Sequence, residues 1–188
     1  YQHLAGMVKM GNVFGAVLIE IKIDVLPPWQ KFVKRLFDIL TSILILVLGF
    51  PFYLLIGSLV KFSSEGPIFF MQERIGLGGK PFKIFKYRSM RVDAEAKGPQ
   101  LSKENDPRIT ALGKLLRKTR IDEFPQFWNV LKGDMSLVGP RPCLLNQKKL
   151  ISERKKRGIF YVKPGMTGLG QISGINMKTP TLLAKTDL

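Results

Sequence analysis

The chain has 188 residues, of which 30 are Lys or Arg and 14 are Asp or Glu, so its formal net charge is +16. This excess predicts an anionic partner: nucleic acid, an anionic membrane surface or a phosphorylated substrate. A single cysteine, Cys143, excludes an internal disulfide and a cysteine-based zinc site, and a single histidine, His3, argues against a histidine-based triad. The chemistry is therefore expected to use carboxylates, Lys and Arg.

Residues 1–28 are expected to form a separate, strand-rich unit. Residues 11–21 are mostly apolar and β-branched, and Pro27-Pro28 ends the stretch. The unit is too short to bury a core, so we interpret it as the tail of an upstream domain or a linker. No secretory leader is evident after Tyr1, and we expect the sequence to be part of a longer chain.

Residues 29–62 contain the most apolar segment. Residues 39–60 carry no charge and are numerous enough to span a bilayer as one helix. Pro51 lies at the centre, where proline breaks or bends a helix, and both ends carry Lys or Arg, which gives no clear orientation. A helix that enters the membrane, breaks at Pro51 and returns to the same face fits these observations. A bent spanning helix and a buried core helix are the alternatives.

Two strands are predicted next, at residues 68–72 and 82–88. The connection at residues 74–80 is rich in glycine and basic residues, which suits a hairpin loop or a phosphate-binding loop. In a regular second strand, Lys86 and Arg88 share one face. Residues 92–105 are polar and are expected to form an exposed loop.

A helix is predicted over residues 107–119, capped by Asp106-Pro107. Its inner face is expected to consist of four apolar residues: Ile109, Leu112, Leu115 and Leu116.

Asp122 and Glu123 follow directly, and Pro125 suits the first turn of a helix. We therefore predict a helix with Asp122 at its N-terminus, ending near Leu131 before Lys132-Gly133. Such a helix start favours an ionised carboxylate or a bound phosphate. An ordinary helix cap is the alternative interpretation of the pair.

The remaining segments are a short buried strand at 136–138, a helix at 144–160 and a strand at 170–173. The last residues, 179–188, are expected to begin another helix. In the Gly-Pro-Arg-Pro turn at 139–142, two prolines fix the backbone around Arg141. An arginine held in this way suits a bidentate phosphate contact, although it could equally be a surface residue.

Taken together, these segments resemble the bacterial sugar transferase family, the monotopic phosphoglycosyl transferases. The resemblance covers about residues 30–188. Besides the broken apolar helix, it is carried by the motifs at residues 72–76 (QERIG), 85–90 (FKYRSM), 122–136 (DEFPQFWNVLKGDMS), 138–142 (VGPRP) and 163–168 (KPGMTG).

The resemblance implies a reaction. A sugar 1-phosphate would pass from a UDP-sugar to undecaprenyl (polyprenyl) phosphate through a covalent phosphosugar-aspartyl intermediate. UMP would leave, and the product would initiate a surface glycan. A catalytically inactive basic scaffold at the membrane surface is the alternative function.

The resemblance also implies roles for individual residues. Asp122 corresponds to the nucleophile and Glu123 to the residue associated with Mg²⁺, the expected cofactor. Lys86 and Arg141 correspond to basic residues that hold phosphate charge. The further substrate-binding candidates are Arg88, Lys163 and Asp187.

The expected fold is α+β and mostly helical, with a re-entrant membrane helix broken at Pro51 at residues 29–62. A small catalytic domain with short strands is expected at residues 63–188, truncated at its C-terminus. The expected location is the cytosolic face of the bacterial cytoplasmic (inner) membrane. Expected partners are the UDP-sugar, undecaprenyl phosphate and membrane lipids, with a homo-oligomer left open. The uncharged segment does not suit a nucleic-acid binder.

Overall fold

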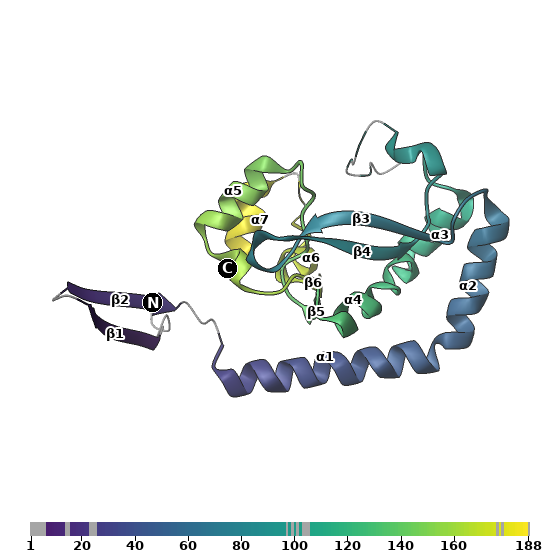
Figure 1. Cartoon of the computed structure of the whole chain (residues 1–188). Helices are drawn as coiled ribbons and strands as arrows, with labels where there is room; N and C mark the ends of the chain where they lie inside the picture. Colours follow the sequence, from purple (N-terminus) through teal and green to yellow (C-terminus); the bar gives the residue numbers. More distant parts are fainter. Residues whose placement is uncertain are drawn as a thin grey trace.

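The computed structural model describes residues 7–13, 16–22, 26–96, 98, 100, 102, 106–175, 177 and 179–187. The strands are β1 (Met7–Val13), β2 (Ala16–Lys22), β3 (Phe69–Ile75), β4 (Pro81–Tyr87), β5 (Ser136–Val138) and β6 (Gly165–Thr167). The α-helices are α1 (Pro28–Leu48), α2 (Phe50–Ser63), α3 (Ala111–Lys118), α4 (Gln126–Lys132), α5 (Lys148–Lys156), α6 (Leu169–Ile172) and α7 (Pro180–Thr186) (Figure 1). The 3₁₀ turns are η1 (Leu77–Gly79), η2 (Val92–Glu95), η3 (Ile121–Glu123) and η4 (Ile159–Tyr161). The fold class is α+β, as predicted.

The strand pair predicted at residues 68–72 and 82–88 is present, and the N-terminal stretch predicted to be strand-rich forms a second pair. β1 and β2 pair in antiparallel register, which confirms the strand-rich N-terminal stretch. β3 and β4 also pair in antiparallel register, up to Ile75 opposite Pro81, so the glycine-rich connection is a hairpin loop. His3 lies outside the described residues, as do positions 97, 99, 101 and 103–105 of the predicted exposed loop.

The apolar segment forms two helices that meet at Gly49 and are bent by 65° (Figure 1). The break falls at Gly49-Phe50-Pro51, as predicted, because Pro51 has no N–H to donate to the preceding turn. Among the described residues, no helix is by itself long and apolar enough to cross a bilayer, whereas α1 and α2 together pass that test.

Polar residues on one face of α1 attach its first half to the rest of the protein. The Arg35 guanidinium donates to the carbonyls of Val130 and Leu131 at distances of 2.6 and 2.9 Å. It thereby places a cation at the C-terminal end of α4, where carbonyls lack helical partners. Buried Asp38 accepts from the Ser136 hydroxyl at 2.8 Å and from the Leu137 N–H at 3.1 Å.

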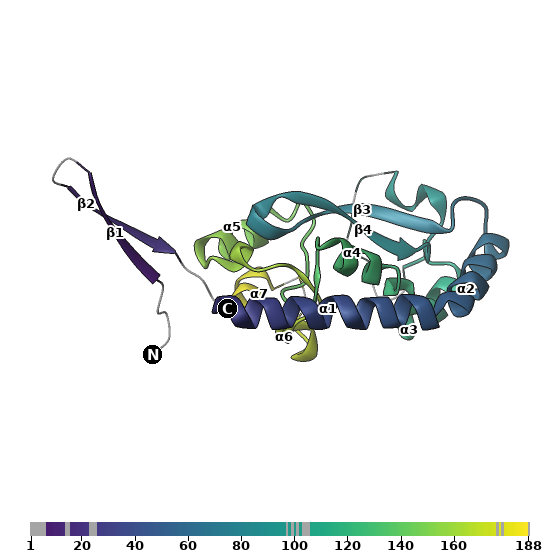
Figure 2. The same ribbon diagram turned by 60° about the horizontal axis from the view of Figure 1, so that its bottom comes forward.

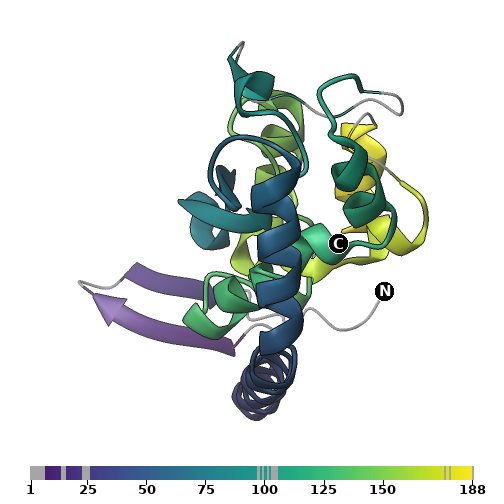
Figure 3. The ribbon, with the colours of Figure 1, turned by 90° about the vertical axis from the view of Figure 1, so that its right-hand side faces the viewer.

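The far end of α2 is attached by a different arginine. Arg88 Nη2 donates to the carbonyl of Val60 at 3.2 Å and to that of Ser64 at 2.6 Å. Figure 3, viewed from the side of α2, shows this helix running past the body of the protein with α1 almost end-on below it. The beginning and the end of the bent pair are therefore both bound to one globular body.

Three small cores organise that body. Ile84 of β4 packs with Val130 and Met135, so α4 lies between β4 and α1 (Figure 2). The second core joins α2, β4 and α3 through Ile56, Val60, Tyr87 and Leu116. The third joins the end of the 139–142 turn to α5 and α7 through Cys143, Leu150, Leu183 and Ala184.

The predicted helix at 107–119 begins later than expected. α3 starts at Ala111, and its N-cap is Thr110, whose hydroxyl accepts from the Gly113 N–H at 3.0 Å. Asp106 instead accepts from Arg108 at 2.6 Å. Leu116 is buried, as expected, but Leu115 is 58% exposed and does not belong to the inner face.

The strand predicted at 170–173 is wrong, because Leu169–Ile172 form the short helix α6. The strand lies earlier, at β6, which pairs in parallel with β5. A Cβ atom on Gly165 would lie 2.1 Å from the backbone nitrogen of Gly139, so this close crossing requires glycine. The predicted helix at 144–160 is shorter, and residues 159–161 form η4 instead.

Candidate active site

Asp122 and Glu123 lie in the one-turn 3₁₀ helix η3, between α3 and α4. The prediction that Asp122 caps a helix extending to Leu131 is wrong, because α4 begins only at Gln126, after Pro125. The predicted stop at Gly133 is confirmed by its left-handed φ of 94°.

Arg120 sets the direction of this turn. Its φ is +61°, and it is the only non-glycine residue with positive φ in the described part of the chain. Such a conformation costs an ordinary side chain about 1–2 kcal/mol, so the surrounding structure must favour it. The reversal at Arg120 turns both carboxylates inward, where Asp122 is 4% and Glu123 8% exposed.

Glu123 is held by two cations that come from distant parts of the chain. Lys86 Nζ on β4 and Arg141 Nη2 in the 139–142 turn each lie 2.7 Å from Glu123 Oε1. Burial alone would raise the pKa of Glu123, but the charges and hydrogen bonds of Lys86 and Arg141 outweigh it and lower the pKa to about 2. Glu123 is therefore ionised at neutral pH.

Asp122 has a different environment. Its Oδ1 atom is buried and accepts no hydrogen bond from the described residues. Burial raises the pKa of Asp122, and the neighbouring negative charge of Glu123 adds to the rise, while Lys86, Arg117 and Arg120 oppose it. A carboxylate with raised pKa is a stronger nucleophile than an ordinary one.

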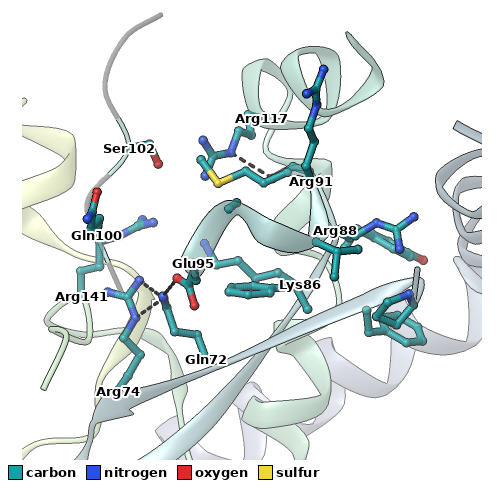
Figure 4. A pocket seen from close by; sticks show the side chains of 18 of the residues that line it. Gln72, Arg74, Lys86, Arg88, Arg91, Glu95, Gln100, Ser102, Arg117 and Arg141 are labelled. Carbon is teal, nitrogen blue, oxygen red and sulfur yellow. Dashed lines mark hydrogen bonds between the residues drawn. The ribbon is translucent and has the colours of Figure 1, made fainter. Parts of the chain in front are cut away.

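A cavity of about 240 Å³ opens beside Lys86 and Arg141 (Figure 4). It is also lined by Arg117, which donates to the Ser89 hydroxyl at 3.0 Å, and by Arg74. Burial lowers the pKa of Lys86, and Glu123 partly restores it. Several cations around one cavity make this the natural place for a phosphorylated ligand.

The structure brings together only some of the predicted site residues. Asp122, Glu123, Lys86 and Arg141 form one cluster. Arg88 lines the same cavity as Lys86, as the strand pattern predicts, but its guanidinium reaches the end of α2 (Figure 4).

The other two candidates lie elsewhere. Lys163 lies at the C-terminal end of α4. Burial lowers its pKa there, and the charge of Arg35 lowers it further, while that of Asp38 opposes the decrease. Asp187 lies 2.5 Å from Arg154 in a buried ion pair, and it also borders a second cavity together with Arg141.

Sequence reasoning missed Arg117 and Arg154. Arg117 is in the last turn of α3 and acts electrostatically on Asp122. Arg154 belongs to a run of basic residues typical of a solvated surface, yet it is 2% exposed. A weak signal for Arg154 was its position four residues after Leu150, which places both on one face of a helix.

The carboxylate of Glu123 fits Mg²⁺ in its donor chemistry, because it is ionised and Mg²⁺ prefers oxygen ligands. Lys86, Arg120 and Arg141 all approach the same one of its two oxygens, Oε1. The described residues contain no group of three acidic, His or Cys side chains that could hold a metal by themselves. A Mg²⁺ ion here would therefore need phosphate oxygens of a substrate, which is its usual mode of binding.

Comparison with known proteins gives consistent matches. The chain is 43% identical over 150 residues to a UDP-N-acetylgalactosamine-undecaprenyl-phosphate N-acetylgalactosaminephosphotransferase of Aeromonas hydrophila. The aligned residues cover 77% of this chain and 35% of that relative. It is 49% identical over 154 residues to a UDP-glucose:undecaprenyl-phosphate glucose-1-phosphate transferase of Klebsiella pneumoniae, covering 79% of this chain and 32% of the relative. An exopolysaccharide production protein of Rhizobium leguminosarum bv. phaseoli is 42% identical over 78% of this chain and 76% of its own length.

The chain thus spans about a third of the length of the first two relatives. Residues 29–188, which include all four clustered site residues, match the family described as bacterial sugar transferase. The chain belongs to the bacterial sugar transferase family.

Proposed function

We propose that this protein transfers a sugar 1-phosphate from a UDP-sugar to undecaprenyl phosphate. The names of the relatives support both substrates, and their sugars differ, so no particular sugar is assigned. The observation that carries the proposal is the contrast within the carboxylate pair. One oxygen of Glu123 is paired with Lys86 and Arg141, whereas the neighbouring buried Asp122 Oδ1 has no hydrogen-bond partner among the described residues.

The transfer is a double displacement. An oxygen of ionised Asp122 forms a bond to the β-phosphorus of the UDP-sugar, and the bond from that phosphorus to the bridging oxygen breaks, so the electron pair leaves with UMP. A phosphate oxygen of undecaprenyl phosphate then attacks the same phosphorus, and the bond to Asp122 breaks. Lys86 and Arg141 are placed to stabilise the negative charge on the transferring phosphoryl group.

Mg²⁺ is the proposed cofactor, held by Glu123 together with substrate phosphate. When bound, it would neutralise diphosphate charge in this weakly solvated site. Within the protein, Lys86 and Arg141 keep Glu123 ionised, so that the carboxylate is ready for the metal.

We also propose that α1 and α2 enter the cytosolic leaflet of the bacterial inner membrane and return to the same face. Exposed apolar side chains cover both helices, among them Phe32, Phe37, Leu44, Leu48 and Phe62. Because Arg35 and Asp38 bind the start of the pair and Arg88 binds its end, both ends belong on the side of the globular body. This arrangement favours the re-entrant helix over a bent spanning helix.

UMP release from a panel of UDP-sugars tests the proposal, with the chain in membranes that contain undecaprenyl phosphate and Mg²⁺. We expect release by the wild-type chain and none above background by Asp122→Asn, because an amide cannot act as the nucleophile. The matched control is Asp93→Asn, an exposed aspartate in η2, which should keep wild-type turnover. Normal turnover in Asp122→Asn would rule out the covalent mechanism. Membrane binding without UMP release by the wild-type chain would favour the scaffold function.

A further inference from the structure

Hydrogen bonds to successive carbonyls hold the turn that carries Arg141. Four successive carbonyl oxygens, from residues 140 to 143, each accept a hydrogen bond from outside the turn. The pairs are Pro140 with the Gly165 N–H at 2.9 Å, Arg141 with Arg154 Nη1 at 2.7 Å, Pro142 with Arg74 Nη1 at 3.3 Å, and Cys143 with the Ile75 N–H at 3.0 Å. The two prolines already restrict this backbone, so the contacts leave it little freedom.

Arg154 makes one of these contacts from a buried position. Its side chain is 2% exposed and lies between α5 and α7. Nε and Nη2 both donate to Asp187 Oδ2, at 3.0 and 2.5 Å, while Nη1 donates to the carbonyl of Arg141. One side of the guanidinium is thus neutralised by Asp187, and another of its nitrogens bonds to the backbone of Arg141.

Stability alone is a poor explanation for this pair. Removing two charges from water is costly, and buried ion pairs are often no more stabilising than apolar residues of similar size. What an apolar pair cannot provide is a donor to the carbonyl of Arg141. The planar fork of arginine suits this double task, because its separate nitrogens can bond to a carboxylate and a carbonyl simultaneously.

We propose that Arg154, neutralised by Asp187, is a positioning residue for the transfer reaction, acting through the backbone of Arg141. By fixing that backbone, it aims the Arg141 guanidinium at Glu123 Oε1, 2.7 Å away. This inference rests on the proposed function. In this proposal, Asp187 neutralises the charge of Arg154 and does not bind the substrate.

The test replaces the buried pair as a whole, in Arg154→Met/Asp187→Leu, so that no charge is left unpaired. We expect this variant to fold, with a melting temperature close to that of the wild-type chain, and to lose about 100-fold in kcat/KM for UMP release. Arg157→Met is the matched control. Arg157 is an arginine at the end of the same helix that pairs with Glu153, and its replacement should leave turnover unchanged.

A double-mutant cycle with Arg141→Ala separates positioning from general damage. If Arg154 acts through Arg141, the pair replacement should have little further effect on kcat/KM once the Arg141 side chain is absent. An equal fold-loss in both backgrounds would overturn the proposal, as would full activity of the pair variant. If the pair variant does not fold, Arg154→Lys serves in the same cycle, because lysine keeps the charge opposite Asp187 but lacks the fork.

UDP affinity, measured by calorimetry, provides a readout that does not depend on turnover. The pair replacement should weaken UDP binding when the chain retains Arg141. It should leave UDP binding unchanged when the chain also carries Arg141→Ala. A wild-type chain that releases no UMP with any sugar in the panel contradicts the proposed function. If the wild-type chain releases UMP and the pair variant is equally active, only the positioning role of Arg154 is contradicted.

Discussion

Asp122 and Glu123 are neighbours in the chain, yet the pKa of the first is raised and that of the second is lowered to about 2. Both carboxylates are buried, so the difference comes from their partners. Lys86 and Arg141 bond to Glu123, whereas Asp122 Oδ1 accepts no hydrogen bond from the described residues. The ionised Glu123 in turn adds to the rise in the pKa of Asp122.

For the proposed reaction, this contrast predicts an acidic limb in the pH profile. In that mechanism the attacking form of Asp122 is the carboxylate, so kcat/KM should fall as the pH drops through its raised pKa. We expect the midpoint of this fall in kcat/KM to lie above pH 3.8, the ordinary pKa of an aspartate. Measuring UMP release across the pH range checks this. Glu123 cannot produce such a limb, because its pKa of about 2 keeps it ionised there. A rate that stays constant down to pH 3.8 would contradict the assignment.

At the scale of the element, the turn η3 depends on the left-handed conformation of Arg120. We predict that Arg120→Gly is more stable than Arg120→Ala by about 1 kcal/mol, because glycine adopts positive φ without a steric penalty. Urea unfolding of the two variants measures the difference. Equal stabilities would show that the turn relaxes when the side chain is removed.

The difference in stability between the two variants contains no contribution from the weak ion pair of Arg120 with Glu123, because both variants lack the arginine. That pair joins atoms 3.7 Å apart, and the arginine side chain is 64% exposed.

The elements that the sequence predicted well are those with a strong local pattern. Pro51 marked the break between α1 and α2, and alternation of apolar and basic residues marked β4. The start of α4 was misplaced because Asp122 is a good N-cap type and Pro125 suits a first helical turn. The structure instead uses both residues in a tight turn, and only the tertiary burial of the carboxylates explains that choice.

The site was predictable in part for a similar reason. Lys86, Glu123 and Arg141 belong to recognisable motifs, and the structure places the charged groups of Lys86 and Arg141 each 2.7 Å from Glu123 Oε1. Arg154 was missed because a basic run normally indicates a solvated face. Its burial depends on Asp187, which lies 33 residues later in the chain, and no local pattern reveals such a pairing.

At the scale of the whole molecule, the attachment of both ends of the bent pair predicts the topology. Cysteines at positions 30 and 65, introduced as Gln30→Cys and Glu65→Cys, should both react with a membrane-impermeant thiol reagent from the cytosolic side only. Labelling of the two positions from opposite sides would establish a spanning helix instead.

The native Cys143 is a suitable background for this experiment. It is fully buried, and burial raises the pKa of its thiol, so the wild-type chain should not be labelled.

The attachment of α1 by Arg35 and of α2 by Arg88 also has a consequence for the choice of membrane. A helix that spans a bilayer must match the hydrophobic thickness of both leaflets, and it tilts or distorts the lipid when it does not. A pair that returns to its own side meets only one leaflet, and its depth is set by the protein. We therefore expect UMP release to be nearly the same in vesicles of short-chain and long-chain lipids, so that bilayer thickness would not restrict where the proposed transfer takes place.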